Sequence, residues 1–275
     1  MVDADTIFEP GALTALVAPF VDPGVGAVAG NAKVGNRRSL LGRWQHLEYV
    51  LDFNLCRRAY DVMRCMPTVP GAIGAFRREA LAGVGGVSSA TLAEDTDVTI
   101  AVGRAGWQVV YAEYARAWTE APSSLGALWR QRYRWSYGTI QAVWKHRHAL
   151  RHLRDPAERR LALVGLPFLV LFQMALPLGA LFVDPLALYG IAFLNPVGIA
   201  ALWLGFNAIQ LAMAAYAFRL DGESLRPLWA LPLQQFVYRQ LTYLVVVASF
   251  VTALEGRRQG WHHLSRTGDV EVAVS

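Results

Sequence analysis

The spacing of apolar side chains predicts a helix followed by a buried strand at the start of the chain. Residues 7–20 have apolar positions at helical intervals behind Pro10, which predicts a short helix. Residues 25–34 are small and apolar, with no charge before Lys33, a pattern typical of a strand buried on both faces. We expect the helix to pack on the sheet that contains this strand.

A longer amphipathic helix is predicted next. Residues 40–58 repeat apolar side chains every three or four positions, with charged side chains between them. Trp44 and Tyr49 would suit a helix lying on a membrane surface, but packing in the core of the domain is the favoured interpretation.

The segment before residue 136 alternates between helix and strand patterns. We predict a helix over residues 94–104, strands over residues 106–111 and 115–118, and a second helix that begins near Pro122. This alternation indicates an α/β fold.

Long uncharged runs dominate the chain after residue 160. Residues 161–183 form a 23-residue run, long enough to cross a hydrocarbon layer about 30 Å thick. Residues 197–218 form a second run, and residues 184–196 between them lack Lys and Arg, which predicts an external loop. A third stretch, residues 229–254, contains several polar side chains, so a span that is broken, re-entrant or interfacial is expected there.

Composition and charge agree with a membrane protein. Hydrophobic residues make up 54% of the chain and charged residues only 17%, which is unusual for a soluble domain. The net charge is +5, and basic residues gather over residues 145–160, beside the first uncharged run. This is the pattern of a cytoplasmic membrane margin, which we favour over a nucleic-acid patch, so no nucleic-acid partner is predicted. Cys56 and Cys65 have no metal or disulfide spacing and are expected to be reduced thiols.

These patterns divide the chain into three parts. We predict a cytosolic domain over residues 1–160, two to three transmembrane helices over residues 161–256, and a basic tail over residues 257–275. The chain opens without an apolar leader, which we interpret as a truncation or a late start codon.

Two groups of carboxylates are the first candidates for chemistry. Asp3 and Asp5 are two residues apart, so both can bind one Mg²⁺ or Mn²⁺ that carries a nucleotide diphosphate, although a solvated pair at a strand end is the alternative. Glu94 and Asp95 follow a glycine-rich loop, and Asp95 is the predicted general base. The alternative is that the acidic side chains only stabilise the start of a helix.

A third candidate group lies on the second predicted helix. Gln131, Arg134 and Trp135 stand at positions i, i+3 and i+4, so they share one helix face and can line one cleft. Arg134 can pair with a departing diphosphate, and Trp135 can present a flat ring to a sugar. Core packing of Trp135 beside a solvated Arg134 is the alternative. Residues 69–78 combine a turn with small side chains, so a ligand can approach the backbone closely there.

The order of these motifs resembles that of the processive family-2 glycosyltransferases, in particular the poly-N-acetylglucosamine synthase branch. An Asp-x-Asp pair comes first, then the Glu-Asp pair, then Gln-x-x-Arg-Trp, and the membrane segment last. The resemblance implies a partial GT-A-type domain, because the family carries its uridine-binding strands before the Asp-x-Asp pair, which begins here at residue 3. It also implies that Gly71 and Arg77 lie near the acceptor sugar.

The resemblance further implies an inverting β-glycosyltransferase in a bacterial inner membrane. Its donor would be a UDP-sugar, with UDP-N-acetylglucosamine as the first candidate. Its acceptor would be a growing glycan that is exported through the membrane helices, and accessory export subunits would be candidate partners. Two alternatives remain open: a non-processive enzyme that glycosylates a lipid, and a non-catalytic remnant or glycan-binding module. We expect the chain alone to insert into membranes but to transfer no sugar, because donor-binding strands would precede residue 3.

Overall fold

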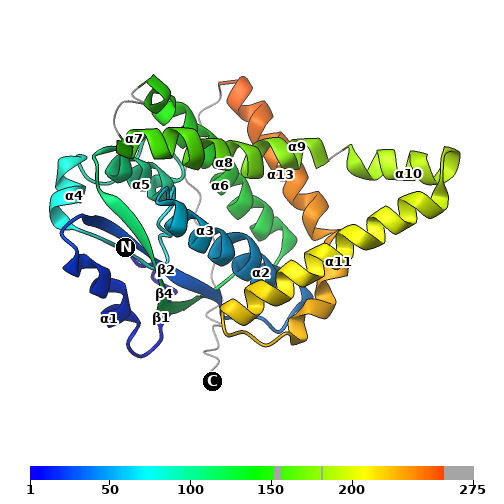
Figure 1. The fold of residues 1–275 in the computed structure, drawn as a ribbon, viewed down its shortest axis with the longest axis horizontal. Helices are drawn as coiled ribbons and strands as arrows, with labels where there is room; N and C mark the ends of the chain where they lie inside the picture. Colours follow the sequence, from blue (N-terminus) through cyan, green and yellow to red (C-terminus); the bar gives the residue numbers. More distant parts are fainter. Residues whose placement is uncertain (152–155, 181, 257–275) are drawn as a thin grey trace.

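A mixed four-stranded sheet forms the centre of the N-terminal half. The computed structural model describes residues 1–151, 156–180 and 182–256. The sheet order is β1 (Ile7–Phe8), β4 (Gln108–Thr119), β2 (Val25–Val34) and β3 (Gly74–Phe76). The two central strands run parallel, and the short edge strands are antiparallel to them. Figure 1 shows α1 on one side of this sheet and the larger helices on the other.

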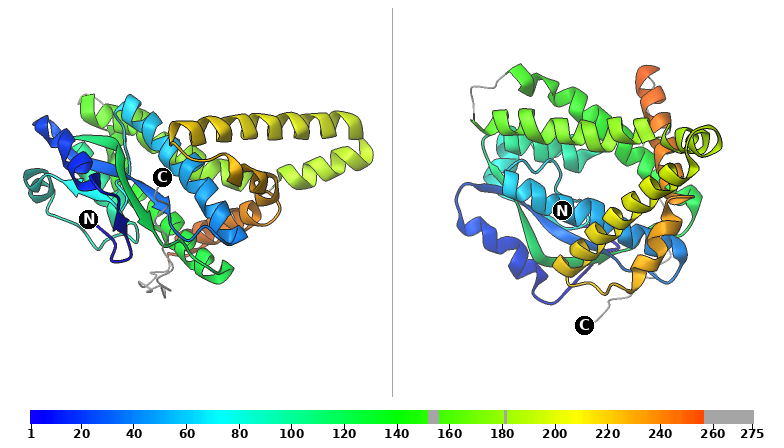
Figure 2. Two further views of the ribbon diagram at one scale, coloured as in Figure 1. Left: turned by 90° about the horizontal axis from the view of Figure 1, so that it is seen from below. Right: turned by 45° about the vertical axis from the view of Figure 1, so that its right-hand side comes forward.

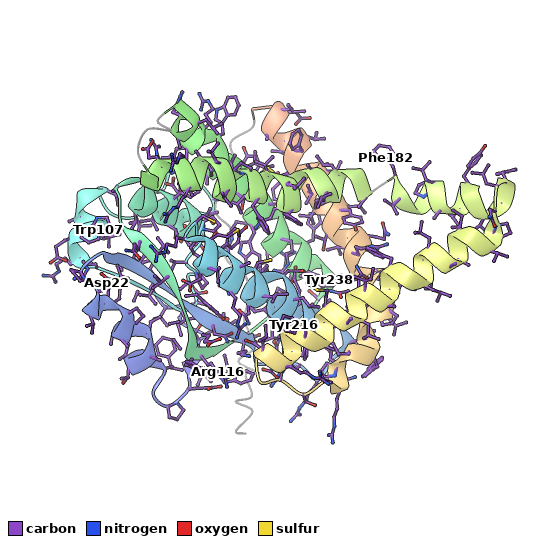
Figure 3. The ribbon with its side chains drawn as sticks, in the orientation of Figure 1. Asp22, Trp107, Arg116, Phe182, Tyr216 and Tyr238 are labelled. Carbon is purple, nitrogen blue, oxygen red and sulfur yellow. The ribbon has the colours of Figure 1, made fainter. Side chains whose placement is uncertain are left out.

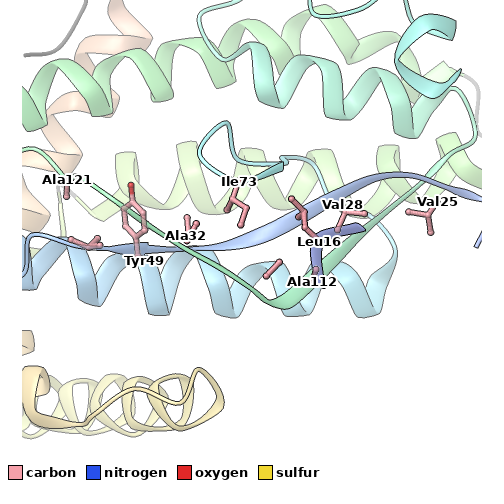
Figure 4. Close-up of a cluster of buried hydrophobic side chains, with 11 residues drawn as sticks. Leu16, Val25, Val28, Ala32, Tyr49, Ile73, Ala112 and Ala121 are labelled. Carbon is pink, nitrogen blue, oxygen red and sulfur yellow. The ribbon is translucent and has the colours of Figure 1, made fainter. Parts of the chain in front are cut away.

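The predicted strand over residues 25–34 is confirmed as β2, and all ten of its residues are buried. Successive side chains of a strand point to opposite faces. Val28 and Ala32 therefore share one cluster, which includes Leu16 of α1 (Ala12–Val17), and Figure 4 shows Leu16 beside Val28. Ala27 and Ala29 pack instead against helices of the opposite face. Both faces are covered, which explains why the sequence of β2 lacks polar alternation.

The helix predicted over residues 7–20 is shorter than expected. Residues 7 and 8 pair with β4 as a strand, the helix begins after Gly11, and a 3₁₀ turn, η1 (Ala18–Val21), follows α1. Gly11 has a φ of 81°, a conformation that glycine adopts without a steric penalty.

The two strands predicted over residues 106–111 and 115–118 are one strand, β4. Its pairing with β2 jumps from Gly30 opposite Ala112 to Asn31 opposite Arg116. Residues 113–115 therefore bulge out of the ladder, and this bulge interrupts the sequence pattern of a strand that is continuous in space.

The amphipathic helix predicted from residue 40 is confirmed and extends further, to residue 63. It consists of α2 (Leu40–Glu48), a π-helical stretch η2 (Tyr49–Asn54) and α3 (Leu55–Met63). Ser39 caps its start by accepting a hydrogen bond from the Gly42 amide at 3.0 Å. Leu47 is fully buried, so core packing, the favoured interpretation, is correct for this face.

Three further helices complete the N-terminal half. They are α4 (Arg78–Gly83), α5 (Glu94–Arg104) and α6 (Leu125–His146). The helix predicted over residues 94–104 has its predicted bounds, and the helix near Pro122 begins after its cap, Ser124. A 3₁₀ turn, η3 (Arg147–Arg151), follows α6.

Two helices of the C-terminal half are long and apolar enough to cross a membrane. The first, Glu158–Ala180, runs through α7 (Pro156–Arg160), η4 (Leu161–Gly165), α8 (Leu166–Val170), η5 (Leu171–Ala175) and α9 (Leu176–Ala180). The second is α11 (Pro196–Leu220). Both agree with the predicted runs within a few residues.

The loop predicted over residues 184–196 is wrong for most of its length, because the chain forms α10 (Val183–Phe193) there. A lack of Lys and Arg does not distinguish a loop from an apolar helix. Figure 2 shows α10 and α11 side by side as a hairpin that extends away from the sheet. Many of their large apolar side chains are exposed in the protein alone, as lipid-facing side chains would be.

The third apolar stretch is sharply bent, which agrees with either a broken span or a re-entrant segment among the predicted alternatives. Arg226–Gln234, made of η6 (Arg226–Ala230) and α12 (Leu231–Gln234), meets α13 (Tyr238–Leu254) at a bend of 53°. The predicted basic tail, residues 257–275, lies outside the described residues.

A buried polar cluster joins α11 to the sheet. Asp221, the residue after α11, accepts from the Lys33 ammonium at 2.5 Å and from the Arg58 guanidinium at 3.0 Å. The side-chain amides of Asn31 and Asn54 donate to the same carboxylate at 3.1 and 3.2 Å. Burial alone would raise the pKa of Asp221, but Lys33 and Arg58 hold it below its usual value. The C-terminal end of α11 is thus fixed to the end of β2.

Candidate active site

Asp95 lies in the first turn of α5, where two backbone amides fix its carboxylate. The Thr96 amide donates to Oδ1 at 2.7 Å, and the Gly71 amide also donates to the carboxylate. Burial raises the pKa of Asp95, and the neighbouring Glu94 raises it further, while these amides and the Arg57 guanidinium oppose the shift. A half-buried carboxyl with a raised pKa is suited to taking up a proton.

Asp3 approaches the same place from the other side of Gly71. A Cβ on Gly71 would lie 3.7 Å from Oδ1 of Asp3, while the Gly71 amide donates to Asp95. The backbone holds this arrangement, because Met1 exchanges hydrogen bonds with Gly74 in both directions. Three segments that are distant in sequence therefore meet at Gly71.

Asp5 follows Asp3 in a turn that is closed by a hydrogen bond from the Thr6 amide to the Asp3 carbonyl at 3.1 Å. Within residues 1–151, 156–180 and 182–256, no group of three or more His, Cys, Asp or Glu side chains is arranged to hold a metal. Two carboxylates do fit Mg²⁺, which commonly takes one or two protein carboxylates together with substrate phosphates and water.

The Gln-x-x-Arg-Trp residues lie on α6. Gln131 is buried, and Arg134 and Trp135 are half-buried. Trp135 packs edge-on against Phe53 with 5.8 Å between ring centroids, and it borders the core cluster on the sheet. Part of the ring therefore packs in the core, and Trp135 as a whole is only half-buried.

Two contacts join α6 to the loop that precedes Asp95. Gly138 of α6 lies against this loop so closely that a Cβ would stand 2.4 Å from the Ala93 nitrogen. Gln141, one turn further, accepts from the Leu92 amide at 2.9 Å. Sequence reasoning missed both residues, although a glycine inside a long helix is a recognisable signal of close packing.

A cluster of ion pairs also joins α5 to α6, nearer the C-terminal end of α6. Asp97 of α5 binds the Lys145 ammonium at 2.6 Å and the His146 Nε2 at 2.8 Å. Burial alone would raise the pKa of Asp97, but the hydrogen bonds from His146 and Lys145 hold it below its usual value. The helices α5 and α6 are thus joined along two turns.

Replacing Gly138 with alanine is expected to displace the loop that precedes Asp95. The added methyl would overlap the backbone of Ala93, so about 1–3 kcal/mol of unfolding free energy and most of the transfer activity should be lost. Gly103→Ala on α5 is the control, because no atom lies within 4 Å of its Cβ position. Thermal unfolding and activity of both variants check this, and equal behaviour would contradict it.

Arg77 has other contacts than predicted from the sequence. Its guanidinium donates to the backbone carbonyls of Phe20, Asp22 and Val25 at 2.8–3.0 Å, which ties α4 to the loop before β2. Figure 3 shows Asp22 and Trp107 at this end of the sheet. The substrate role of Arg77 stays a prediction that these contacts do not support.

Arg57 was not among the predicted site residues. It lies on α3, donates to the side-chain Oδ1 of Asn54 at 3.0 Å and is close enough to Asp95 to oppose the rise of that residue's pKa. Its place on the long amphipathic helix gave no sign of this, because only the fold brings α3 beside α5.

Known proteins resemble this chain in sequence and in fold. Residues 1–218 match the model of glycosyl transferase family group 2. The poly-beta-1,6-N-acetyl-D-glucosamine synthase of Staphylococcus aureus strain COL is 33% identical to this chain over 138 residues. The synthase of Staphylococcus epidermidis is 30% identical to it, also over 138 residues. This match covers 50% of the chain and 34% of each relative, so the chain matches about a third of their length.

A solved structure supports the fold independently. The mannosyltransferase of Pyrobaculum calidifontis, solved in complex with GDP-Man and Mn²⁺, aligns with 94% of this chain and 62% of its own at a TM-score of 0.57. At 20% identity this likeness concerns the fold, which is GT-A-like, with two candidate membrane helices after the catalytic domain. Motif order, fold and the match over residues 1–218 agree, and the chain belongs to glycosyl transferase family group 2.

Proposed function

We propose that this chain carries the catalytic and membrane residues of an inverting β-glycosyltransferase that extends a polysaccharide from a UDP-sugar. The observation that carries the proposal is the meeting of Asp3 and Asp95 at Gly71, since it brings a candidate metal ligand beside a candidate base. The resemblance to poly-N-acetylglucosamine synthases supports UDP-N-acetylglucosamine as the donor.

The proposed transfer has one displacement step. A hydroxyl of the acceptor glycan loses its proton to the Asp95 carboxylate as its oxygen bonds to the anomeric carbon of the donor. The bond from that carbon to the diphosphate breaks, and its electron pair leaves with UDP. Because the acceptor attacks opposite the leaving group, an α-linked donor gives a β-linked product.

Asp3 and Asp5 would hold Mg²⁺ or Mn²⁺. The ion would supply positive charge to the diphosphate. Arg134 would donate hydrogen bonds to the same leaving group, while Gln131 and Trp135 would border the acceptor sugar. Glu94 would act through Asp95, whose pKa it raises.

The membrane part has a proposed orientation. We place residues 1–160 in the cytoplasm and residues 161–256 across a bacterial inner membrane, because basic residues gather over residues 145–160. The glycan would leave beside these helices, with or without accessory export subunits.

Radiolabelled UDP-N-acetylglucosamine tests the function. Membranes that contain this chain, or a longer polypeptide of which it is part, are supplied with the donor and Mn²⁺. Label in a high-molecular-weight glycan supports the proposal. Label only in extractable lipid indicates a lipid glycosyltransferase, and no transfer from any UDP-sugar in either form of the protein contradicts catalysis.

Replacing Asp5 with alanine should weaken donor binding and Mn²⁺ dependence together, because the diphosphate loses part of its metal site. We expect the KM for the donor to rise at least about tenfold, which corresponds to a loss of about 1.4 kcal/mol of binding free energy. Glu79→Ala, which removes an exposed carboxylate on α4, is the control and should change neither. An unchanged Mn²⁺ titration of the Asp5 variant would exclude this metal pair.

A further inference from the structure

Arg132, inside the Gln-x-x-Arg-Trp segment, contacts the side chains on both sides of it. It is 5% exposed, and its Nη1 donates to Oε1 of Gln131 at 2.6 Å. Its guanidinium lies 4.3 Å from the ring centroid of Trp135, close enough for a cation–π contact. One buried cation therefore holds both the amide of Gln131 and the ring of Trp135.

Two residues from other helices hold Arg132 in turn. Glu48 of α2 forms a buried ion pair with its Nη2, and the Tyr238 hydroxyl accepts from the same Nη2 at 3.1 Å. Tyr238 donates to Oε2 of Glu48 at 2.6 Å, which closes a ring of three groups. We call Glu48, Arg132 and Tyr238 the three-helix cluster.

Tyr238 brings a membrane-side helix into this cluster. It is the first residue of α13, directly after the bend of 53° from α12. It is 2% exposed and shares an apolar cluster with Phe218 at the end of α11. Figure 3 shows Tyr238 in the interior, away from Phe182 at the start of the projecting hairpin. The position of α13 thus bears directly on Arg132.

Stability alone is a poor explanation for this cluster. Burying a carboxylate and a guanidinium costs several kcal/mol of desolvation, and apolar side chains of similar volume commonly stabilise such a site as well or better. A planar cation, however, fixes the direction of two neighbours at once, which an apolar side chain cannot do.

We propose that the three-helix cluster positions Gln131 and Trp135 according to the placement of α13. When α13 is seated, Tyr238 and Glu48 orient Arg132, and Arg132 orients the two side chains. These are positioning residues, and the effect on transfer rests on the proposed function. Because Gln131 and Trp135 are assigned to the acceptor, the cluster makes acceptor placement sensitive to the membrane helices.

Tyr238→Phe tests this with the loss of a single oxygen atom. Misplacement of a reacting group by about 1 Å can cost about 100-fold, so we expect kcat to fall about 10- to 100-fold. The KM for the UDP-sugar should remain within about twofold, since Asp3 and Asp5, the proposed metal pair for the diphosphate, lie outside the three-helix cluster. Hydrogen exchange of the α6 amides over residues 131–135 should become faster by several-fold.

Tyr133→Phe is the matched control. Its hydroxyl also joins α6 to α13, through a 2.8 Å bond to Thr252, but it lies outside the three-helix cluster. This variant should keep the wild-type kcat and exchange rate. Equal effects of the two variants, or unchanged exchange over residues 131–135 in Tyr238→Phe, would overturn the inference.

The two readouts separate this inference from the proposed function. Hydrogen exchange reports on the cluster whether or not UDP-sugar is turned over. Absence of transfer by the unmodified protein would count against the function alone. Faster exchange in Tyr238→Phe with an unchanged kcat would show that the cluster orders α6 without positioning the acceptor, and would overturn the catalytic part of the inference.

Discussion

Asp95→Asn is expected to abolish sugar transfer while leaving the UDP-sugar bound. The amide keeps the shape of the side chain and one hydrogen-bond acceptor, but it takes up no proton. A positioned general base contributes about 10²–10⁴-fold to the rate, so kcat should fall by at least about 100-fold. The KM of residual transfer and UDP binding should remain near the wild-type values. Single-turnover transfer and equilibrium binding of UDP measure the two quantities.

The same variant should not be less stable at neutral pH. Burial raises the pKa of Asp95 in the folded protein, so the unfolded chain ionises first as pH rises above about 3.8. Ionised Asp95 therefore costs stability once the pH passes its folded pKa, and asparagine removes this cost. We expect an equal or higher Tm for Asp95→Asn at pH 8, with a smaller difference at pH 4.

Asp97→Asn on the same helix is the matched control, and its expected effect on Tm has the opposite sign. Its ion partners hold the pKa of Asp97 below the usual value, so its contribution to stability is present above about pH 3.8 and lost as pH falls through the folded pKa. Asp97→Asn should lower Tm at pH 8. Near-normal turnover by Asp95→Asn, or a clear loss of its Tm at pH 8, would contradict the assignment of Asp95.

Asp221→Asn is expected to have the largest effect on stability. The substitution removes the charge of the nearer of two carboxylates that bind the ammonium of Lys33, which is 1% exposed, and leaves Glu223 at 3.0 Å and the backbone carbonyl of residue 221 at 3.4 Å. Removing one partner of a buried ion pair costs about 3–5 kcal/mol of unfolding free energy. Denaturation of the protein in detergent measures this loss, and α11 should separate from β2 first because Asp221 joins them.

A double-mutant cycle separates the pair from its surroundings. Lys33→Met alone should cost less than Asp221→Asn, because Asp221 keeps Arg58 and two amide donors. The double variant should be more stable than the sum of the two losses predicts, by about 0.5–3 kcal/mol. Additive losses would show that the two side chains do not stabilise each other.

Elements with a regular period were predictable from the sequence, and elements defined by distant contacts were not. The strand β2 and the helix from residue 40 were identified because each carries a complete pattern. The strand β4 was divided in two because its bulge, residues 113–115, breaks that pattern. The helix α10 was interpreted as a loop because absence of charge is a topological signal and carries no information on backbone conformation.

The candidate site was predictable in its residue types but not in its arrangement. The motif order predicts roles for Asp3, Asp95 and Trp135, yet nothing in their spacing indicates that Gly71 lies between the two carboxylates. Tyr238 lies more than 100 residues from Arg132, in a stretch whose sequence pattern shows only polar side chains among apolar ones. Its partners are on two other helices, so no local pattern contains them.

The bulge in β4 also favours the native alignment of β4 on β2. Two parallel strands have no tight turn to set their alignment, and a slip by one residue would turn every side chain to the wrong face. Asn31 donates to the Glu113 carbonyl at 3.1 Å, and the Glu113 carboxylate binds Arg58 at 3.1 Å. The native alignment of β4 on β2 places Glu113 within reach of both Asn31 on β2 and Arg58 on α3. Shortening residues 113–115 would therefore remove the feature that distinguishes the native alignment of β4 from its neighbours.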